Sequence, residues 1–245
     1  IARVIQVLNR MMDRLEASFR QATRFSADAS HELKTPLAIM QGELENALQA
    51  AAPGSSEQQL FTNLLEEAQR LKAITQSLLL LAQADAGQLK LALEPVDLSA
   101  ELEGMIEDAR VLGADHRLTF ETHIPAGARV PADRALLHTA LFNLITNAIK
   151  YNQPDGLIEV RLESVPGKTT LTIGNTGPGI AEGDRAKVFE RFYRVGPADA
   201  PCVEGIGLGL SLAREIVRAH GGELLLQESR PGWTSFVLDL PRAAS

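Results

Sequence analysis

The chain has 245 residues, of which 45% are hydrophobic and 22% charged, a composition typical of soluble globular proteins rather than of disordered or collagen-like chains. Its 31 acidic and 24 basic side chains give a net charge of −7, which argues against duplex nucleic acid as the main partner because phosphate binding requires clustered lysine and arginine. The single cysteine, Cys202, excludes an intrachain disulfide framework and a multi-cysteine zinc site.

The sequence contains no stretch long and apolar enough to span a membrane. Its longest uninterrupted apolar run, residues 78–82, is far shorter than the ~20 residues that a bilayer requires. No signal peptide precedes the chain, which opens on Ile1 rather than on methionine. We therefore expect a fragment whose natural N-terminus, with any membrane anchor, lies before Ile1.

Two long helices are predicted in the N-terminal part. Apolar residues recur at alternating steps of three and four over residues 1–50, which is the pattern of a narrow coiled-coil seam. Pro53 and Gly54 then break the pattern, and a second seam ends near Gly87. The apolar residues of the second seam are Leu60, Leu64, Leu71, Ile74, Leu78 and Leu81. An antiparallel hairpin cannot bury both seams alone, so we expect dimerisation into a four-helix bundle.

The pattern changes beyond residues 93–95. Helices mixed with short, antiparallel-looking strands predict an α+β domain of about 150 residues. The predicted helices are 98–112, 133–151 and 208–220, and the predicted strands are 117–124, 157–165, 169–175, 222–229 and 234–240. We therefore expect the chain to divide near residue 94 into a helical dimer module and a globular domain.

His31, on the first predicted helix, is a candidate nucleophile. It points away from the seam, Thr35 lies four residues on along the same face, and Pro36 predicts a kink just past it. A solvated surface histidine is the ordinary interpretation of such a residue. That interpretation is kept for His116, His123, His138 and His220. The chemical alternative is that the imidazole, whose pKa is ~6.5, attacks a phosphoryl group while Glu32 takes its ring proton.

Residues 25–36 resemble the H-box of sensor histidine kinases of two-component systems, in the common His-Glu-x-Lys/Arg-Thr-Pro form. Residues 1–16 resemble the end of the HAMP linker helix that usually precedes this box. The resemblance implies a dimerisation and histidine phosphotransfer hairpin over residues 17–93 and a catalytic ATP-binding domain over residues 94–245.

The predicted helix 133–151 carries a polar stripe beside its apolar one. Leu137, Leu141, Leu144, Ile145 and Ala148 form the predicted buried stripe. Asn143, Asn147, Lys150 and Tyr151 form the neighbouring polar stripe at helical spacing. Amide oxygens suit Mg²⁺ as ligands, and a lysine can meet phosphate as a point charge.

Glycine-rich stretches follow in a fixed order. They are residues 174–180, then the aromatic and basic stretch 188–194, then residues 205–210, which open the last helix. Glycines let backbone N–H groups approach phosphate, and a helix N-terminus adds positive potential. In this order they resemble the N, G1, F and G2 boxes of the histidine-kinase catalytic domain, and residues 232–236 resemble a weaker G3 box. That domain is an α/β sandwich shared with gyrase, MutL and the ninety-kilodalton heat-shock chaperones.

A further glycine-lysine pair has another interpretation. Gly167-Lys168-Thr169 resembles the end of a Walker A loop, but Leu162 stands where the first glycine should be. The tripeptide also joins two alternating strands, so it predicts a hairpin turn.

The resemblance implies an ATP-dependent protein-histidine kinase that acts as a homodimer with Mg²⁺ as its metal. The nucleotide-binding residues that it implies are Asn143, Asn147, Lys150, Tyr151, Asn175, Gly177, Gly179, Arg191, Arg194, Gly205, Gly207, Leu208 and Gly209. Asn147 is the expected metal ligand, with Asn143 as a second.

The resemblance also implies the route of the phosphoryl group. It passes from ATP to His31, with Glu32 as base, and then to an aspartate of a response regulator receiver domain. Thr35 matches a position that helps to orient water for dephosphorylating that regulator, which implies a phosphatase activity. The implied location is the cytoplasmic portion of an inner-membrane sensor.

Two positions depart from the family pattern. Asn175 stands where the G1 box normally has Asp, whose carboxylate accepts the adenine amino group. An amide oxygen can still accept, and a flipped amide could donate, so we expect weaker ATP binding that discriminates less against guanine. Asparagine here, like the Phe-x-Arg-Phe-Tyr-Arg stretch, is also found among heavy-metal-sensing histidine kinases. Asn143 stands where the hydrolysing relatives have a water-activating Glu, which favours His31 over water as the acceptor.

Two other functions stay open on the sequence. A gyrase-like ATPase would release phosphate steadily without a phosphoenzyme, and Asn143 and the H-box argue against it. A catalytically dead dimeric scaffold would bind a regulator but no ATP, and only Asn175 favours that function.

Overall fold

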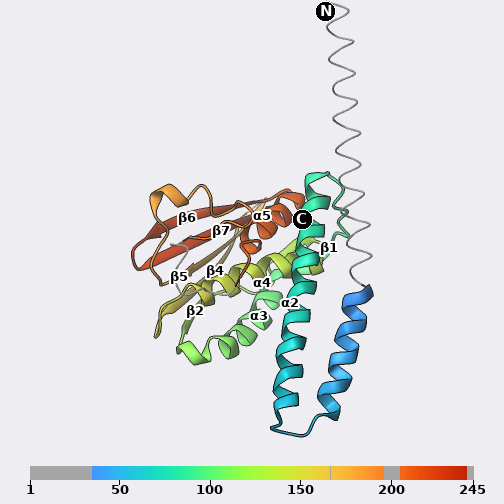
Figure 1. The fold of residues 1–245 in the computed structure, drawn as a ribbon. Helices are drawn as coiled ribbons and strands as arrows, with labels where there is room; N and C mark the ends of the chain where they lie inside the picture. Colours follow the sequence, from blue (N-terminus) through green and yellow to red (C-terminus); the bar gives the residue numbers. More distant parts are fainter. Residues whose placement is uncertain (1–34, 166, 196–204, 242–245) are drawn as a thin grey trace, which may run out of the picture. The chain divides into compact units, whose positions relative to one another are not determined.

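The computed structural model describes residues 35–165, 167–195 and 205–241, and the chain divides into two units between Leu89 and Lys90 (Figure 1). Residues 1–16, His31 and Glu32 lie outside the described residues. Thr35 and Pro36 begin the helix described over residues 35–50. In the described part of the chain, no helix is both long and apolar enough to cross a membrane.

The remaining elements alternate between helix and strand. The helices are α2 (Ser56–Asp85), α3 (Leu98–Leu112), α4 (Arg134–Lys150) and α5 (Gly209–Ala219), with the short 3-10 helices η1 (Ala114–His116) and η2 (Glu182–Asp184). The strands are β1 (Glu94–Asp97), β2 (Thr119–His123), β3 (Arg129–Ala132), β4 (Leu157–Val165), β5 (Lys168–Asn175), β6 (Glu223–Arg230) and β7 (Trp233–Pro241).

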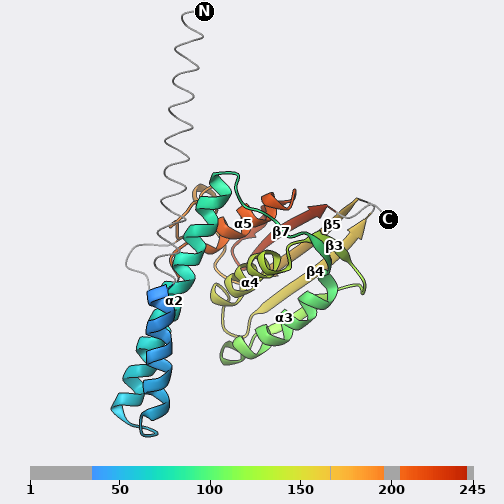
Figure 2. The same cartoon turned by 90° about the vertical axis from the view of Figure 1, so that its right-hand side faces the viewer.

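The first unit is a helical hairpin, as predicted. The helix over residues 35–50 and α2 lie side by side (Figures 1 and 2), and Lys72 Nζ donates a hydrogen bond to Gln41 Oε1 at 2.9 Å. The turn between them contains Gly54 at φ +77°, and α2 is capped by Ser55, whose side chain accepts from the Gln58 backbone N–H. The glycine in the turn and the serine cap together explain why the first helix ends and the second begins at this point.

The second seam is left open in the single chain. Of the six predicted seam residues, Leu60, Leu64, Leu71 and Leu78 are 40–54% exposed, whereas Leu81 is buried. A row of exposed leucines along one helix is costly in water unless another surface covers it. In the described part of the hairpin, these leucines therefore form the exposed apolar surface that the sequence predicts.

The second unit is built on a five-stranded sheet with strand order β2-β4-β5-β7-β6. The pairs β4–β5, β5–β7 and β6–β7 are antiparallel, but β2 pairs with β4 in parallel. The expectation of antiparallel strands was therefore wrong for β2. The parallel pairing arises from the long connection between β2 and β4, which runs through β3 and α4 and returns the chain to the end of the sheet where β2 starts.

A second, two-stranded sheet was not predicted. It pairs β1 with β3 in antiparallel register, with Pro95 opposite Pro131. Each strand has only four residues, too few to show an alternating pattern. The Gly167 turn was predicted correctly, because Val165 pairs with Lys168 in a β4–β5 hairpin in which Gly167 has φ +83°.

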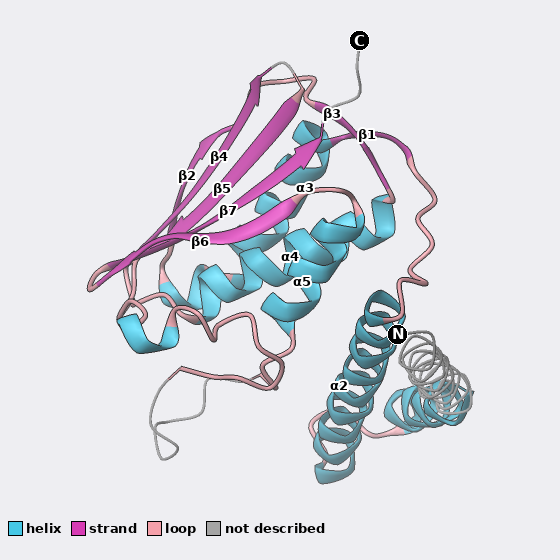
Figure 3. Ribbon diagram, turned by 90° about the horizontal axis from the view of Figure 1, so that it is seen from above, coloured by secondary structure: helices cyan, strands magenta, loops and turns pink. Residues whose placement is uncertain are grey.

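Helices α3, α4 and α5 lie on the same face of the five-stranded sheet (Figure 3). The predicted buried stripe of α4 faces this core, and its five residues are 0–3% exposed. Sheet residues Ile158, Leu162 and Leu171 are 0–1% exposed. Because the apolar stripe of α4 is buried against the sheet, the polar stripe of the same helix lies outside the core, where its side chains can meet a ligand.

One polar junction fixes the start of α4. Asp133 caps the helix by accepting from Leu136 N–H at 3.1 Å and also accepts from Ala92 N–H at 3.0 Å. The backbone N–H of Asp133 donates to Nε2 of buried His220, whose Nδ1 donates to the Ile216 carbonyl. Partial burial alone would raise the pKa of the Asp133 carboxyl, but the backbone N–H groups outweigh it and hold that pKa below its ordinary value.

We expect Asp133→Ala to lower the free energy of unfolding of the second unit by about 1–2 kcal/mol at pH 7, because that is the cost of losing such a cap. Since the folded state depresses the pKa of this carboxyl, its contribution is present above about pH 4 and is lost as the pH falls. Urea unfolding at pH 7 and pH 3 measures the difference, with exposed Asp115→Ala as the control. A penalty that stays constant in acid would contradict this account.

Candidate functional site

The polar stripe of α4 contains two asparagines in different environments. Asn143 Nδ2 donates to the Thr139 carbonyl at 2.8 Å, and its Oδ1 lies so near α5 that a Cβ added to Gly209 would be 2.8 Å away. Asn147 is half-exposed, and its side chain makes no hydrogen bond to a described residue. Lys150, one turn further, is exposed and pairs with no described acid. Asn147 and Lys150 are thus the members of the stripe that are available to a ligand.

The C-terminal end of α4 is joined to the end of β5. Asn175 is 5% exposed, and its Nδ2 donates to the Thr176 carbonyl at 2.8 Å and to the Tyr151 carbonyl at 3.4 Å. Tyr151 is the C-cap residue directly after α4, and its side chain is exposed at the surface. Two predicted site residues that are 24 positions apart therefore meet directly.

Residues 176–181, which we call the glycine loop, are supported by the end of β6 and by the turn that follows it. The Gly232 N–H donates to the Gly177 carbonyl at 2.9 Å, and the Ile180 N–H donates to Ser229 Oγ at 2.7 Å. Gly179 has φ +78°, and a Cβ there would lie 2.5 Å from the Arg230 carbonyl oxygen. Only glycine fits this position, because both the backbone angle and the close approach exclude a side chain.

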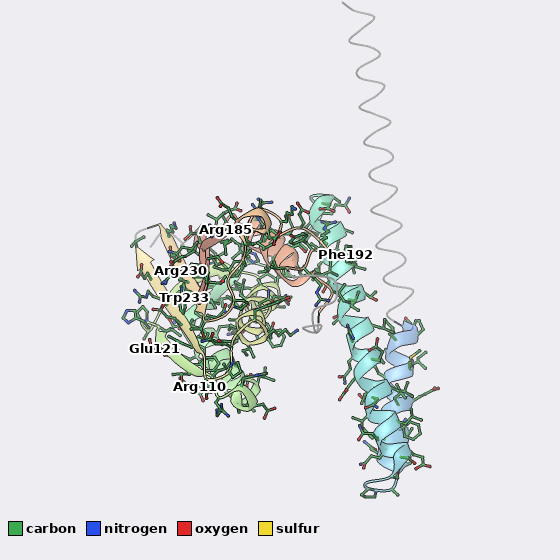
Figure 4. All side chains as sticks on the ribbon, turned by 60° about the vertical axis from the view of Figure 1, so that its left-hand side comes forward. Arg110, Glu121, Arg185, Phe192, Arg230 and Trp233 are labelled. Carbon is green, nitrogen blue, oxygen red and sulfur yellow. The ribbon has the colours of Figure 1, made fainter. Side chains whose placement is uncertain are left out.

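The predicted F-box and G2 stretches also meet. The Phe192 N–H donates to the Gly207 carbonyl at 2.8 Å, and Phe192 itself is 57% exposed with φ +62° (Figure 4). Gly207 has φ +78°, and a Cβ there would lie 2.7 Å from the Tyr193 carbonyl oxygen. The bend that leads into α5 is therefore built on backbone contacts that a larger residue would break.

The N-terminus of α5 is free of side-chain caps. Leu208 occupies the cap position, and Ser211 Oγ donates to the Leu208 carbonyl instead of accepting from the helix. Backbone N–H groups of a first turn without a cap, together with the helix dipole, attract anions. With Asn143 beside Gly209, this end of α5 adjoins the polar stripe of α4.

A cavity of about 710 Å³ lies beside the glycine loop. It is lined by residues 178–182, 184, 185, 193–195, 230 and 231, which include the labelled Arg185 and Arg230 of Figure 4. Tyr193 donates from its hydroxyl to Asp184 at 2.6 Å, and this hydrogen bond raises the pKa of the tyrosine. Arg185 donates to the Ser229 carbonyl at 2.6 Å. The cavity therefore combines cations with the backbone of the glycine loop.

Several supporting residues could not be found from the sequence. Two of them, Ser229 and Arg185, hold the glycine loop through hydrogen bonds. The third, Trp233, packs against Gly174 of β5 so closely that a Cβ on Gly174 would overlap the indole ring. They lie 44 to 59 positions from their partners, so no local pattern marks them. The one signal near them was the weak G3 resemblance at residues 232–236.

The predicted residues divide into those that the structure brings together and those that it does not. Contacts join Asn143 with Gly209, Tyr151 with Asn175 and Gly177, and Gly207 with the F-box backbone. Gly179 and Arg194 line the same cavity, whereas Arg191 and Gly205 are exposed residues on either side of residues 196–204. Thr35 is exposed in the first unit, and His31 and Glu32 are outside the described residues. No three His, Cys, Asp or Glu side chains gather as a metal cluster within the described ranges.

Comparison with known proteins finds two family matches. Residues 21–87 match the His Kinase A (phospho-acceptor) domain. Residues 132–244 match the family described as histidine kinase-, DNA gyrase B- and HSP90-like ATPase. The two matches fall on the helical hairpin and on the sheet-bearing unit.

Individual relatives agree with these families. The probable sensor histidine kinase TcrY of Mycobacterium tuberculosis is 35% identical over 241 residues, covering 96% of this chain and 50% of TcrY. The histidine-protein kinase/phosphatase MprB of Mycobacterium sp. (strain KMS) is 33% identical over 252 residues, covering 98% of this chain and 48% of MprB. A solved mycobacterial MprB structure is 34% identical with a TM-score of 0.54, covering 60% of this chain and 97% of that one. The chain thus spans about half the length of the curated relatives that it matches.

Proposed function

Because the chain belongs to the sensor histidine kinases of two-component systems, we propose that it binds ATP in its second unit and transfers the γ-phosphoryl group to its own His31. The observation that carries this proposal is the convergence of α4, the end of β5, the glycine loop and the N-terminus of α5. Separate contacts, Asn143 with Gly209 and Tyr151 with Asn175, draw these segments into one site.

Each part of the site has a role in binding the nucleotide. Asn175 accepts from the adenine amino group, and the glycine backbones and the uncapped α5 terminus contact phosphate oxygens. Lys150, which has no acidic partner among the described residues, adds a positive charge. Tyr151, Arg191 and Arg194 complete the phosphate surroundings, with Gly205, Gly207, Leu208 and Gly209 supplying backbone.

The donor set fits Mg²⁺ shared between the protein and the nucleotide. Asn147 offers an amide oxygen that no described residue engages, and amide oxygen is a ligand that hard cations accept. Asn143 is the second candidate: its Nδ2 donates to the Thr139 carbonyl, so the oxygen that could meet the metal is Oδ1, which lies near Gly209. When bound, Mg²⁺ neutralises charge on the phosphates.

The transfer step itself uses His31 and Glu32. One imidazole nitrogen forms a bond to the γ-phosphorus, the bond from that phosphorus to the bridging oxygen breaks, and ADP leaves. Glu32 takes the proton from the other ring nitrogen, so the phosphorylated ring stays neutral. The group then passes to an aspartate carboxylate of a response regulator receiver domain, which regenerates His31.

Three further assignments belong to the same proposal. The exposed leucines of α2 support a homodimer, whose four-helix bundle would bury them. Thr35, which is exposed and follows His31 by four positions in the sequence, positions water for dephosphorylating the regulator, and the name of the relative MprB includes a phosphatase. The family also supports a place in the cytoplasmic portion of an inner-membrane sensor.

One incubation with γ-labelled ATP and Mg²⁺ separates this function from its rivals. We expect acid-labile label on the protein and little release of inorganic phosphate. Steady phosphate release without labelled protein would instead indicate a gyrase-like ATPase. Neither signal, together with no nucleotide binding, would indicate a scaffold.

A further inference from the structure

The F-box stretch holds one residue in an unfavourable backbone conformation. Phe192 has φ +62°, which is rare for a bulky side chain, and its ring is 57% exposed, so packing of the ring does little to hold it. Its backbone N–H donates to the Gly207 carbonyl at 2.8 Å. A strained conformation of this kind persists only where the surrounding structure fixes it. The neighbours of Phe192 must therefore supply that constraint.

Tyr193, the next residue, is tied down by its side chain. The hydroxyl donates to Asp184 Oδ1 at 2.6 Å, and both residues are half-buried. The backbone N–H of Tyr193 donates to the Glu190 carbonyl at 3.4 Å, and the Lys187 ammonium lies 5.7 Å from the centroid of the tyrosine ring. The residue that follows Phe192 is thus anchored to η2 by a hydrogen bond to a carboxylate.

Asp184 is itself fixed against the glycine loop. Its backbone N–H donates to the Ala181 carbonyl at 2.9 Å. The residue after it, Arg185, donates to the Ser229 carbonyl at 2.6 Å and to the Ile180 carbonyl at 3.4 Å. η2 and the glycine loop therefore have a common support at the end of β6.

The hydrogen bond from Tyr193 to Asp184 thus lies between two segments that contact phosphate in the proposed function. On the Asp184 side is the glycine loop, and on the Tyr193 side is the bend before α5, reached through Phe192 and Gly207. Without this bond Tyr193 would be free to move. The strained backbone of Phe192 could then relax, and its contact with the Gly207 carbonyl would be lost.

We propose that Asp184 and Tyr193 are positioning residues, whose hydrogen bond holds the bend before α5 in the conformation that binds the phosphates of the nucleotide. This proposal rests on the proposed function, since it concerns the same nucleotide site. The two side chains act through the backbone of residues 192 and 207 and not on the nucleotide itself. Removing either partner removes the same bond, so the two removals have the same effect.

Titration calorimetry of the full chain with ADP and Mg²⁺ tests this proposal. Tyr193→Phe removes only the hydroxyl, and Asp184→Ala removes its acceptor. We expect each variant to bind ADP about 10-fold more weakly, which is the effect of losing a hydrogen bond to a charged group. The double variant is expected to lose no more than either single variant, because the second change finds the bond already broken.

Asp184→Asn is the conservative variant of the series. It keeps an oxygen that can accept from the tyrosine hydroxyl but removes the charge. We expect it to restore most of the ADP affinity, to within about threefold of the wild type. A residue that only stabilises the fold would change the melting temperature without this order of affinities.

Thr170→Val is the matched control. Thr170 Oγ1 donates to Asp239 Oδ1 at 2.8 Å, so this variant also removes a hydroxyl that donates to a carboxylate. That bond joins β5 to β7 and involves no residue of the glycine loop, the F-box stretch or η2. We expect its melting temperature to fall and its ADP affinity to stay at the wild-type level.

The outcomes separate this proposal from the function on which it rests. Wild-type ADP affinity in Tyr193→Phe, additive losses in the double variant, or equal losses in Asp184→Asn and Asp184→Ala would each overturn the proposal and leave the proposed function standing. Failure of the wild type to bind ADP would overturn both. If Asp184→Ala does not fold, Tyr193→Phe and Asp184→Asn decide, because each changes a single group without removing the side chain.

Discussion

Replacing Gly207 with alanine is expected to abolish nucleotide binding while the second unit stays folded. Gly207 has φ +78°, and a Cβ there would lie 2.7 Å from the Tyr193 carbonyl oxygen and 2.8 Å from the Phe192 carbonyl carbon. The left-handed conformation alone costs an alanine about 1–2 kcal/mol. The clash adds to that cost, and backbone atoms cannot move aside as a side chain end could. We therefore expect the bend before α5 to open and ADP affinity to fall by about 100-fold or more.

Gly183→Ala is the matched control for this substitution. Gly183 lies in η2, and a Cβ there would have no heavy atom within 4 Å. We expect its ADP affinity and melting temperature to stay at the wild-type level. Titration calorimetry and thermal unfolding of both variants provide the comparison. Wild-type affinity in Gly207→Ala would show that the nucleotide does not depend on this bend.

Asn147→Ala is expected to abolish phosphoryl transfer without loss of stability. The Asn147 side chain is half-exposed and makes no hydrogen bond to a described residue, so its removal breaks nothing in the fold. Its proposed partner is Mg²⁺, whose charge stabilisation is worth several kcal/mol to the transition state. We expect the labelling rate with γ-labelled ATP to fall by about 100-fold or more, with an unchanged melting temperature.

Asn152→Ala should show the opposite pattern. Asn152 ties the end of α4 to β4, since its Nδ2 donates to the Leu157 carbonyl and its Oδ1 accepts from Thr176 Oγ1. Removing it is expected to lower the melting temperature while the folded protein keeps its labelling rate. Undiminished labelling of Asn147→Ala would refute the metal assignment, whatever Asn152→Ala does.

The periodic elements of this chain could be predicted because their pattern is local. The buried stripe of α4 repeats at the helical period and is 0–3% exposed in the structure. Buried and less buried residues alternate over most of β4 and over the first six residues of β5, which is long enough for the pattern to appear, and β6 and β7 are also eight or nine residues long. The pairings of β4 with β5 and of β6 with β7 follow from short connections such as the Gly167 turn.

The missed features depend on partners that are far away in sequence. The parallel pairing of β2 with β4 follows from a crossover, and β1 and β3 have four residues each. The support of the glycine loop by Ser229 and Arg185 joins residues 44 to 49 positions apart. No local pattern encodes such contacts, because they form only when the sheet has assembled.

Asn175 shows how the two kinds of information combine. The sequence identified the position and its unusual residue, but it left both orientations of the amide open. The carbonyls of Tyr151 and Thr176 supply the missing constraint, and the Tyr151 carbonyl belongs to the residue directly after α4. The chemistry of a single side chain was therefore set by a neighbour 24 positions away.

The most direct test of the proposed kinase is the labelling of one histidine. The full chain and its His31→Gln variant are incubated with Mg²⁺ and γ-labelled ATP, with His116→Gln, an exposed histidine of η1, as the control. We predict acid-labile, alkali-stable label in the wild type and in His116→Gln, and none in His31→Gln, whose ADP affinity should be unchanged. Persistent labelling of His31→Gln would contradict the central claim that His31 receives the phosphoryl group.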